Sequence, residues 1–257
     1  MKRRHLFELE DQDWFPRFLR DYGTDFLEFV ANQFHIYKPA VDLLKKGLAK
    51  SGGSTVIDLA SGGGGGWKRL APDLQAEVPD LKVVQTDYFP NLDAFAKMKA
   101  HHPEIMDSVP ESVSALDVPA ELKGLRTQFL SFHHFKPADA QQILQNAVDA
   151  NAPIAIFEAQ ERDLKHFIQF CFSPINVLLV TPFIRPFKIG RLIFTYLIPL
   201  MLPFIFWDGI VSVLRTYTEE EMREMTTALR NADHFSWEIG SLKNGPFSIP
   251  YLLGYPN

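Results

Sequence analysis

Residues 55–67 read TVIDLASGGGGGW, so a short apolar stretch runs directly into five consecutive glycines. Thr55–Leu59 is rich in β-branched residues and is predicted to form a buried strand. Apolar residues at helical spacing predict a helix over Gly66–Glu77. Glycine lets the backbone adopt positive φ and approach a ligand closely, and a helix start offers unpaired N–H groups. The stretch therefore predicts an α/β fold with a ligand site at the glycine loop. A turn without a ligand is the weaker alternative, because five glycines cost more conformational entropy than a simple turn needs.

The alternation of strands and helices continues along the rest of the chain. Helices are predicted at Leu92–His101 and Pro137–Ala150. The predicted strands, which are short and largely apolar, are Thr55–Leu59, Lys82–Gln85, Val113–Leu116, Thr127–Ser131, Ile154–Phe157, Ser236–Ser241 and Tyr251–Tyr255. Strands that alternate with helices of about ten or more residues form mainly parallel sheets with helices on both faces. We therefore expect an α/β fold built on a mainly parallel seven-stranded sheet.

Helical patterns are also present near both ends of the sequence. Residues 1–50 are predicted to form an N-terminal helical arm, in which Pro39 opens a second helix. The main domain is expected to span residues 51–257. Near its end, Thr218–Asn231 is predicted to be a helix, because Thr218 precedes three glutamates in a capping-box arrangement.

Composition and charge exclude several classes of protein. Hydrophobic residues make up 46% of the 257 positions and charged residues 22%, which indicates a globular chain with a sizeable core. A net charge of −5 argues against a nucleic-acid-binding protein. The single cysteine, Cys171, excludes an internal disulfide framework and a CxxC site. Acidic residues follow the basic start where a secretory signal needs an apolar run, so we expect a cytoplasmic protein, with membrane association as an open alternative.

Residues 164–215 do not fit a plain α/β pattern and are predicted to form an apolar cap inserted after the fifth strand. Within them, residues 167–207 hold eight phenylalanines and five prolines, and the only charges are Arg185, Lys188 and Arg191. Two uncharged runs of 18 and 16 residues are short for a membrane-spanning helix, and each contains two prolines. Four interpretations stay open: a buried cap or homodimer contact, a tunnel for a hydrophobic substrate, a peripheral membrane contact, and a membrane hairpin. Purely basic charge on an apolar segment suits an anionic lipid surface.

The glycine loop lacks the common nucleotide-binding motifs. The dinucleotide pattern GxGxxG fails in every register, because its last glycine would fall on Trp67, Lys68 or Arg69. No Gly-Lys-Ser/Thr closes the loop as a Walker A motif would require. The chain also lacks a tyrosine followed four residues later by lysine, the catalytic pair of short-chain dehydrogenases. A nicotinamide-dependent oxidoreductase is therefore disfavoured.

The loop resembles the first motif of the class I S-adenosylmethionine-dependent methyltransferases, and the resemblance extends from about residue 39 to the C-terminus. That motif is an acid followed by spaced small residues. Here Asp58, Ala60, Gly62 and Gly64 match it, with alanine in the place of the first glycine. The family's acid at the end of the second strand is matched by Asp87, and the resemblance implies that this carboxylate accepts hydrogen bonds from the ribose hydroxyls of the cofactor.

Two further family elements follow in the expected order. Asp117, at the end of the predicted third strand, matches an acid that reaches the adenine amino group, and residues 132–135 (FHHF) match an aromatic–His–His–aromatic turn. The resemblance implies a Rossmann-like methyltransferase fold with S-adenosylmethionine as the cofactor. The cofactor-binding residues that it implies are Asp58, Ala60, Ser61, Gly62, Gly63, Gly64, Asp87, Tyr88, Leu116, Asp117, Ser131 and Phe132. The three aspartates have an alternative role as ordinary hydrogen-bond acceptors in turns.

His133, His134 and Glu158 are the candidate catalytic residues. The histidines follow the fourth predicted strand, at the edge where open α/β sheets collect ligands, and imidazole titrates near neutral pH. One of them could act as a general base, or the turn could line the cofactor instead. Glu158 could orient an acceptor or be a solvated loop acid. No metal site is predicted, because adjacent residues seldom converge on one ion and the chain has no HExxH motif.

Polar residues outside these motifs have two interpretations each. Asp208 and Arg215, where the chain returns from the cap, either form a structural ion pair or anchor the mouth of the cleft. Gly209 between them is predicted to lie in a turn. The segment Asp11–Pro16 either folds over the cofactor or caps the sheet.

The sequence thus predicts a methyltransferase that acts on a hydrophobic small-molecule or lipid-like acceptor. The cofactor carries the intrinsic reactivity in methyl transfer, so the protein has to align the acceptor and exclude water, and the chain needs no catalytic triad. A hydrophobic acceptor is expected because the apolar cap stands where the family commonly carries its substrate elements. No nucleic-acid partner is expected. The alternative of another class is a non-catalytic protein that binds a membrane or a partner on a methyltransferase scaffold.

Overall fold

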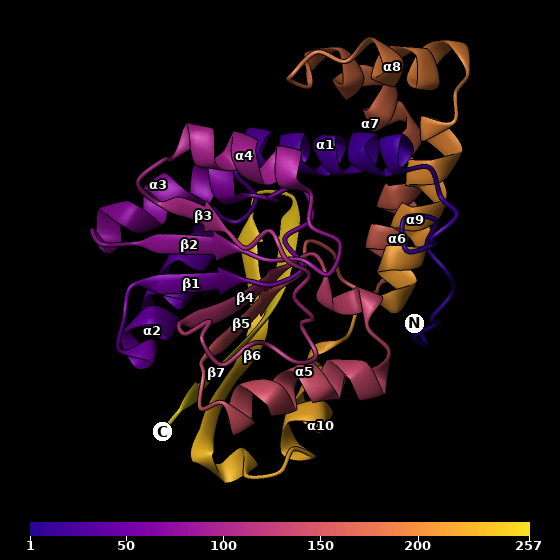
Figure 1. Cartoon of the computed structure of the whole chain (residues 1–257). Helices are drawn as coiled ribbons and strands as arrows, with labels where there is room; N and C mark the ends of the chain where they lie inside the picture. Colours follow the sequence, from indigo (N-terminus) through magenta and orange to yellow (C-terminus); the bar gives the residue numbers. More distant parts are fainter.

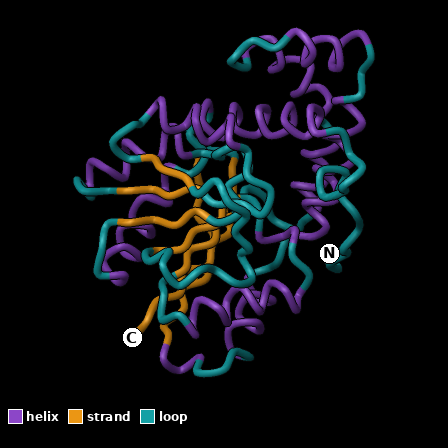
Figure 2. Tube along the Cα trace, in the orientation of Figure 1, coloured by secondary structure: helices purple, strands orange, loops and turns teal.

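The computed structural model describes residues 1–257 and contains one seven-stranded sheet with helices on both sides (Figures 1 and 2). The strand order is β3-β2-β1-β4-β5-β7-β6. The first five strands run parallel, and β7 is antiparallel to both of its neighbours. The strands are β1 (Thr55–Asp58), β2 (Lys82–Gln85), β3 (Met106–Ser108), β4 (Leu125–Phe129), β5 (Ile154–Phe157), β6 (Phe235–Asn244) and β7 (Phe247–Pro256). The predicted mainly parallel seven-stranded sheet is confirmed.

The helices also follow the predicted alternation. They are α1 (Arg17–Gln33), α2 (Val41–Ser51), α3 (Trp67–Glu77), α4 (Leu92–His101), α5 (Pro137–Asp149), α6 (Leu164–Cys171), α7 (Ser173–Val180), α8 (Ile189–Leu192), α9 (Met201–Arg215) and α10 (Glu219–Thr227). Shorter helical turns are η1 (Lys38–Ala40), η2 (Phe132–His134), η3 (Thr181–Phe183), the π-helical η4 (Ile193–Leu197) and η5 (Ala232–His234). The capping box of Thr218 is confirmed, because its side chain accepts from the Glu221 N–H while the Glu221 carboxylate accepts from the Thr218 N–H.

Two buried clusters attach helices to the two faces of the sheet. On one face, Leu44 of α2 and Leu70 of α3 pack with Val56 of β1. On the other, Leu144 of α5 and Met222 of α10 pack in a cluster with Ile57 of the same strand. Neighbouring residues of β1 therefore point into different clusters, as strand geometry requires. Helix α2 falls inside the predicted N-terminal arm and yet contributes to the core. The division into arm, main domain and cap stays a prediction.

The third strand lies elsewhere than predicted. It is β3, Met106–Ser108, which pairs with β2 at the sheet edge. The prediction of a strand at Val113–Leu116 is wrong: this stretch is a loop in which Ser114 and Asp117 close a turn. Its alternating apolar residues, Val113 and Ala115, are buried loop side chains rather than one face of a strand.

Strand β4 begins and ends two residues before the predicted Thr127–Ser131. Leu130 has a φ of 51°, in the left-handed region, so the backbone leaves the strand direction immediately after Phe129. Ser131 then precedes the short helix η2 that carries both candidate histidines. The two histidines therefore sit just beyond the carboxyl end of β4.

The segment 164–215 is helical and packs against α1. Buried residues of α1, including Leu19 and Phe26, form a cluster with Val177 and Phe204 from α7 and α9. The part around α7 and α8 projects beyond α1, away from the sheet (Figure 1). No helix in the chain is long and apolar enough by itself to cross a membrane; two helix pairs, bent by 46° and 85°, meet the length and composition criteria only as pairs.

Gly209 is not in a turn as predicted but lies inside α9. A Cβ atom at this position would come within 2.6 Å of Cδ1 of Phe170. Its lack of a side chain lets α6 and α9 approach closely, which is a packing role that a single sequence does not distinguish from a turn.

Candidate active site

The end of β1 is held by buried hydrogen bonds around Asp58. One carboxylate oxygen accepts from Ser61 Oγ at 2.7 Å and the other from Thr127 Oγ1 of β4 at 2.7 Å. Burial raises the pKa of Asp58 to about 6, although these hydroxyls favour the charged form. Asp58 thus ties the start of the glycine loop to a neighbouring strand, and its side chain points into the protein.

The glycine loop that follows uses positive φ repeatedly. Ala60, Gly62, Gly64 and Gly65 have φ values of 52°, 52°, 93° and 49°. A Cβ on Gly64 would lie 2.8 Å from Cε of Met98 and 3.1 Å from Nε2 of Gln85, whereas a Cβ on Gly62 would meet nothing within 4 Å. The loop therefore packs inward at Gly64 and leaves open space at Gly62, where a ligand can approach the backbone.

Asp87 lies directly against this loop. Its Oδ2 accepts from the N–H of Gly62 at 2.8 Å, and its Oδ1 accepts from the N–H of Phe89 at 2.8 Å. Burial raises the pKa of Asp87, and the two N–H groups act in the opposite direction. Tyr88 beside it is exposed, and its ring meets the Phe89 ring edge-on at 4.8 Å. Asp87 and the glycine loop, both implied by the resemblance to bind the cofactor, are therefore in contact.

The remaining residues proposed to bind the cofactor are distributed around the strand ends. Ser131 is buried and its Oγ has no hydrogen-bond partner. Phe132 is buried against Tyr217, with ring centroids 5.3 Å apart. Leu116 is half-buried and Asp117 is exposed. Because 113–118 is a loop, Asp117 does not lie at the end of the third strand as predicted.

A cavity of about 520 Å³ adjoins the glycine loop at Gly63. It lies between α1 and α4 and is lined by polar side chains, among them Thr24, Asn91 and Lys97. A Cβ on Gly63 would come within 3.1 Å of Cβ of Thr24, so α1 passes close to the loop. Asp87 and Ser131 do not line this cavity, which therefore lies beside the predicted cofactor residues rather than over them.

His133 is held in place by Glu158. The Glu158 side chain accepts from the backbone N–H of His133 at 2.9 Å, and its second oxygen lies 2.8 Å from Nδ1 of the same residue. Both residues are buried. The contact fixes the ring so that Nε2 faces Glu8, 3.9 Å from its carboxylate. The structure thus brings two of the candidate catalytic residues together, and Glu158 is not a solvated acid.

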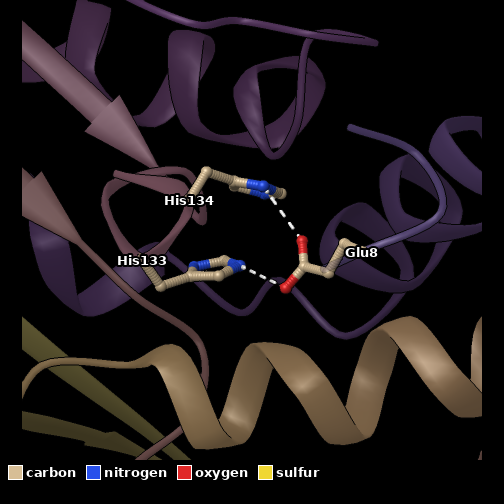
Figure 3. A group of neighbouring side chains, drawn as sticks. All are labelled: Glu8, His133 and His134. Atoms are coloured by element: carbon tan, nitrogen blue, oxygen red, sulfur yellow. Dashed lines mark ion pairs between the residues drawn. The ribbon is translucent and has the colours of Figure 1, made fainter. Parts of the chain in front are cut away.

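Glu8 joins both histidines, as Figure 3 shows. Its carboxylate is fully buried and lies 3.0 Å from Nδ1 of His134, which is also 2.9 Å from Asp11. Burial of the His134 ring lowers its pKa, but the carboxylates of Glu8 and Asp11 outweigh this and raise it well above the usual value. Burial also raises the pKa of Glu10, beside the same ring, to about 8.

Sequence reasoning did not assign Glu8 to the site. It lies more than 120 positions from the histidines, and the only signal was the run of acids at positions 8, 10 and 11. In the neighbouring segment Asp11–Pro16, Asp11 contacts His134. Whether this segment folds over the cofactor or caps the sheet stays a prediction.

Asp208 and Arg215 do not pair with each other; both bind the N-terminal segment. Asp208 accepts from the backbone N–H groups of Leu9 and Glu10 at 2.8 and 3.0 Å. Arg215 Nη1 lies 2.6 Å from Asp11 and 3.2 Å from Glu8. The predicted ion pair between them is therefore wrong, and both act as polar anchors of the N-terminal segment; their place at the mouth of a cleft stays a prediction.

Glu8, His133 and His134 also place potential metal-ligand atoms within 4.8 Å of one another. The guanidinium of Arg215 already lies 3.2 Å from the Glu8 carboxylate, and a cationic His134 donates to Asp11 and lies 3.0 Å from Glu8. Positive charge is therefore supplied from the protein itself, and Nδ1 of His133 is engaged by Glu158. The expectation of no metal stays a prediction.

Comparisons with known proteins give matches among solved structures only. No protein-family profile and no curated protein sequence matches the chain. Mitomycin 7-O-methyltransferase is 13% identical with a TM-score of 0.48, over 84% of this chain and 53% of that one. Human N-acetylserotonin methyltransferase in complex with S-adenosylmethionine is 14% identical with a TM-score of 0.49, over 90% and 56%. Plantazolicin methyltransferase in complex with S-adenosylhomocysteine is 10% identical with a TM-score of 0.49, over 94% and 99%. This chain thus spans little more than half the length of the first two proteins.

Proposed function

We propose that the chain is an S-adenosylmethionine-dependent methyltransferase with a hydrophobic small-molecule or lipid-like acceptor. The observation that carries the proposal is the contact between Asp87 and the N–H of Gly62 at 2.8 Å. It joins an acid beyond β2 to an open glycine loop beyond β1, at the edge of the sheet where α/β proteins bind ligands.

The residues around this edge fit the cofactor. Each oxygen of Asp87 accepts one N–H and retains capacity to accept a ribose hydroxyl. The open space at Gly62 lets the cofactor approach the loop backbone, and the unpaired buried hydroxyl of Ser131 supplies a further polar contact. When bound, S-adenosylmethionine supplies an electrophilic methyl group on its sulfonium.

In the proposed mechanism the protein orients the acceptor and holds its proton. Glu158 accepts the Nδ1 proton of His133, which leaves the lone pair on Nε2 as the base. The acidic N-terminal segment over His133 excludes water from this base. His134 stays cationic between Glu8 and Asp11 and holds that segment in place.

The hydrophobic nature of the acceptor is proposed from the cap. Helix α9 of the cap contacts η2, which carries His133, so the apolar cap lies directly beside the proposed base. Apolar side chains contribute affinity in proportion to the area that they remove from water.

A non-catalytic scaffold is the second candidate. It is favoured by the burial of His133, which is 1% exposed beneath Glu8, so the base is covered in this conformation. The two candidates differ in whether the N-terminal segment opens to admit an acceptor.

The first experiment is calorimetric titration with S-adenosylmethionine and S-adenosylhomocysteine. We expect binding by the wild-type chain and a loss of about tenfold or more in Asp87→Asn, because a hydrogen bond to a charged group contributes this much. Asp107→Asn, which alters an exposed acid on β3, is the matched control and should bind normally. Equal binding by both variants would contradict the ribose assignment, and no binding by folded wild-type protein would overturn the cofactor proposal.

The acceptor is tested next with a methyl-labelled cofactor and a cell extract divided into lipid and aqueous fractions. We expect label in the lipid fraction and its loss in His133→Gln. Label confined to polar acceptors would show that the hydrophobic assignment is wrong. Cofactor binding without any label transfer would favour the scaffold.

A further inference from the structure

The projecting part of the segment 164–215 exposes large apolar side chains. Phe183, Phe187, Ile189 and Leu197 are 65%, 60%, 70% and 76% exposed. They come from η3, the linker before α8, α8 itself and η4, which form the cap tip, residues 179–198. Figure 1 shows α7 and α8 extending beyond α1, away from the sheet. Exposed apolar surface gathered in one place marks an interaction site.

The cap tip is packed against the rest of the fold at its base, so its apolar residues are exposed although the segment that carries them is anchored. Ile184 is buried in a cluster with Leu19 of α1 and Phe204 of α9. Arg191 is buried and bonds to Asp25 of α1 at 2.6 Å and to the carbonyls of Ile184 and Pro186. The base of the cap tip is therefore anchored to α1 and α9.

The charge of the cap tip indicates what kind of partner it binds. The cap tip contains three basic residues and no acid, and two of them, Lys188 and Arg191, are paired with Asp25 of α1. Arg185 is exposed, and its guanidinium bonds only to the carbonyls of Pro182 and Ile184, so its charge has no acidic partner. Anionic lipid headgroups complement the charge of Arg185, while a second copy of the same surface would present another unpaired Arg185 and no acid.

We propose that the cap tip inserts into the headgroup and upper acyl region of a membrane that contains anionic lipid. The apolar residues enter the acyl boundary and Arg185 binds headgroup phosphates, as in proteins that lie on a membrane rather than span it. The proposal goes beyond methyl transfer and does not depend on cofactor binding, so the two can fail independently.

The test is flotation of the purified full chain with phosphatidylcholine vesicles, with and without phosphatidylglycerol. We expect stronger flotation with phosphatidylglycerol. The double variant Phe187→Ser, Ile189→Ser should partition at least about tenfold more weakly, because two apolar side chains leave the lipid. Arg185→Gln should weaken binding about fivefold with anionic vesicles and leave the weak binding to phosphatidylcholine unchanged.

The matched control is Phe34→Ser with Leu92→Ser, two exposed apolar residues outside the cap, at 53% and 50% exposure. This variant should float like the wild type, and all proteins should keep their melting temperature. Equal binding by the cap-tip and control variants would overturn the proposal. It would also be overturned by a wild type that does not float but forms a dimer in sedimentation, with the dimer lost in the cap-tip variant.

Discussion

His134 illustrates how its neighbours set the charge of one side chain. Nδ1 lies 3.0 Å from Glu8 and 2.9 Å from Asp11, and Nε2 lies 3.7 Å from Glu10. Burial lowers the pKa of His134, but the carboxylates of Glu8 and Asp11 outweigh it and hold the pKa well above 6.5. Folding thus binds a proton more tightly here than the unfolded chain does, and linkage makes stability depend on pH.

The raised pKa of His134 determines how its contribution to stability changes with pH. A histidine with a raised pKa stabilises the fold fully below the unfolded value of 6.5, and the contribution is lost as pH rises through the folded value. In urea unfolding near pH 6, the substitution His134→Gln should lower the free energy of unfolding by about 1–3 kcal/mol. This loss should shrink at alkaline pH, where His134 is no longer charged in either state. His234→Gln, at an exposed histidine, is the control. A deficit that stays constant with pH would contradict a cationic His134.

The sequence allowed some site residues to be predicted and not others, for a physical reason. Asp58 ends β1 and Asp87 lies two residues beyond β2, so the local strand patterns were enough to place both at strand ends. The contact of Glu8 with His133 and His134 depends on how α9 and the N-terminal segment pack, and no local pattern encodes such distant pairing. The raised pKa of His134 could not be predicted from the sequence either, because it results from the packing of the N-terminal segment against η2.

Positive φ values in the glycine loop restrict which residues each position accepts. Gly64→Ala should lower the free energy of unfolding by about 1–3 kcal/mol, because positive φ and overlap with Met98 act together. Ala60→Gly should raise it by about 1 kcal/mol, because Ala60 already has a φ of 52°. Urea unfolding followed by tryptophan fluorescence measures both. Opposite signs support the loop geometry, and destabilisation by both variants would contradict it.

Among the secondary-structure elements, those with strong local signals were predicted well. Helix α4 has the predicted bounds, Leu92–His101, and its N-cap Asn91 accepts from the N–H of Ala94. The third strand was misplaced because β3 is short, lies at the edge and lacks β-branched residues. Val113–Leu116 looked more like a strand than β3 did, since burial in a loop and burial in a strand leave similar apolar patterns.

For the molecule as a whole, Asp25 joins the cap to the rest of the fold. It is buried in α1 and lies 2.6 Å from Arg191, 2.7 Å from Lys188 and 3.5 Å from Lys97 of α4. The substitution Asp25→Asn should lower the free energy of unfolding by about 3–5 kcal/mol, because Arg191 is left buried without a counter-charge. Replacing Arg191 by Met in the same chain should recover part of this loss. The control is Asp21→Asn, one turn earlier on α1. Thermal unfolding measures the stability of each variant. An equal loss of stability in Asp25→Asn and Asp21→Asn would contradict the role of Asp25 as the counter-charge of Arg191.

The contacts of the N-terminal segment also constrain when the fold can be completed during synthesis. Arg215 donates to the carbonyl of Leu6, 209 positions earlier, and Asp208 accepts from Leu9, 199 positions earlier. Residues 6–11 leave the ribosome long before α9 does, and at about 5–20 residues per second that interval is tens of seconds or less but far longer than local helix formation. Throughout it, the Glu8 carboxylate lacks Arg215, one of the cations that neutralise it in the folded chain. The burial of His133 is therefore a late step of folding, reached after the sheet strands β1 to β5 have been synthesised.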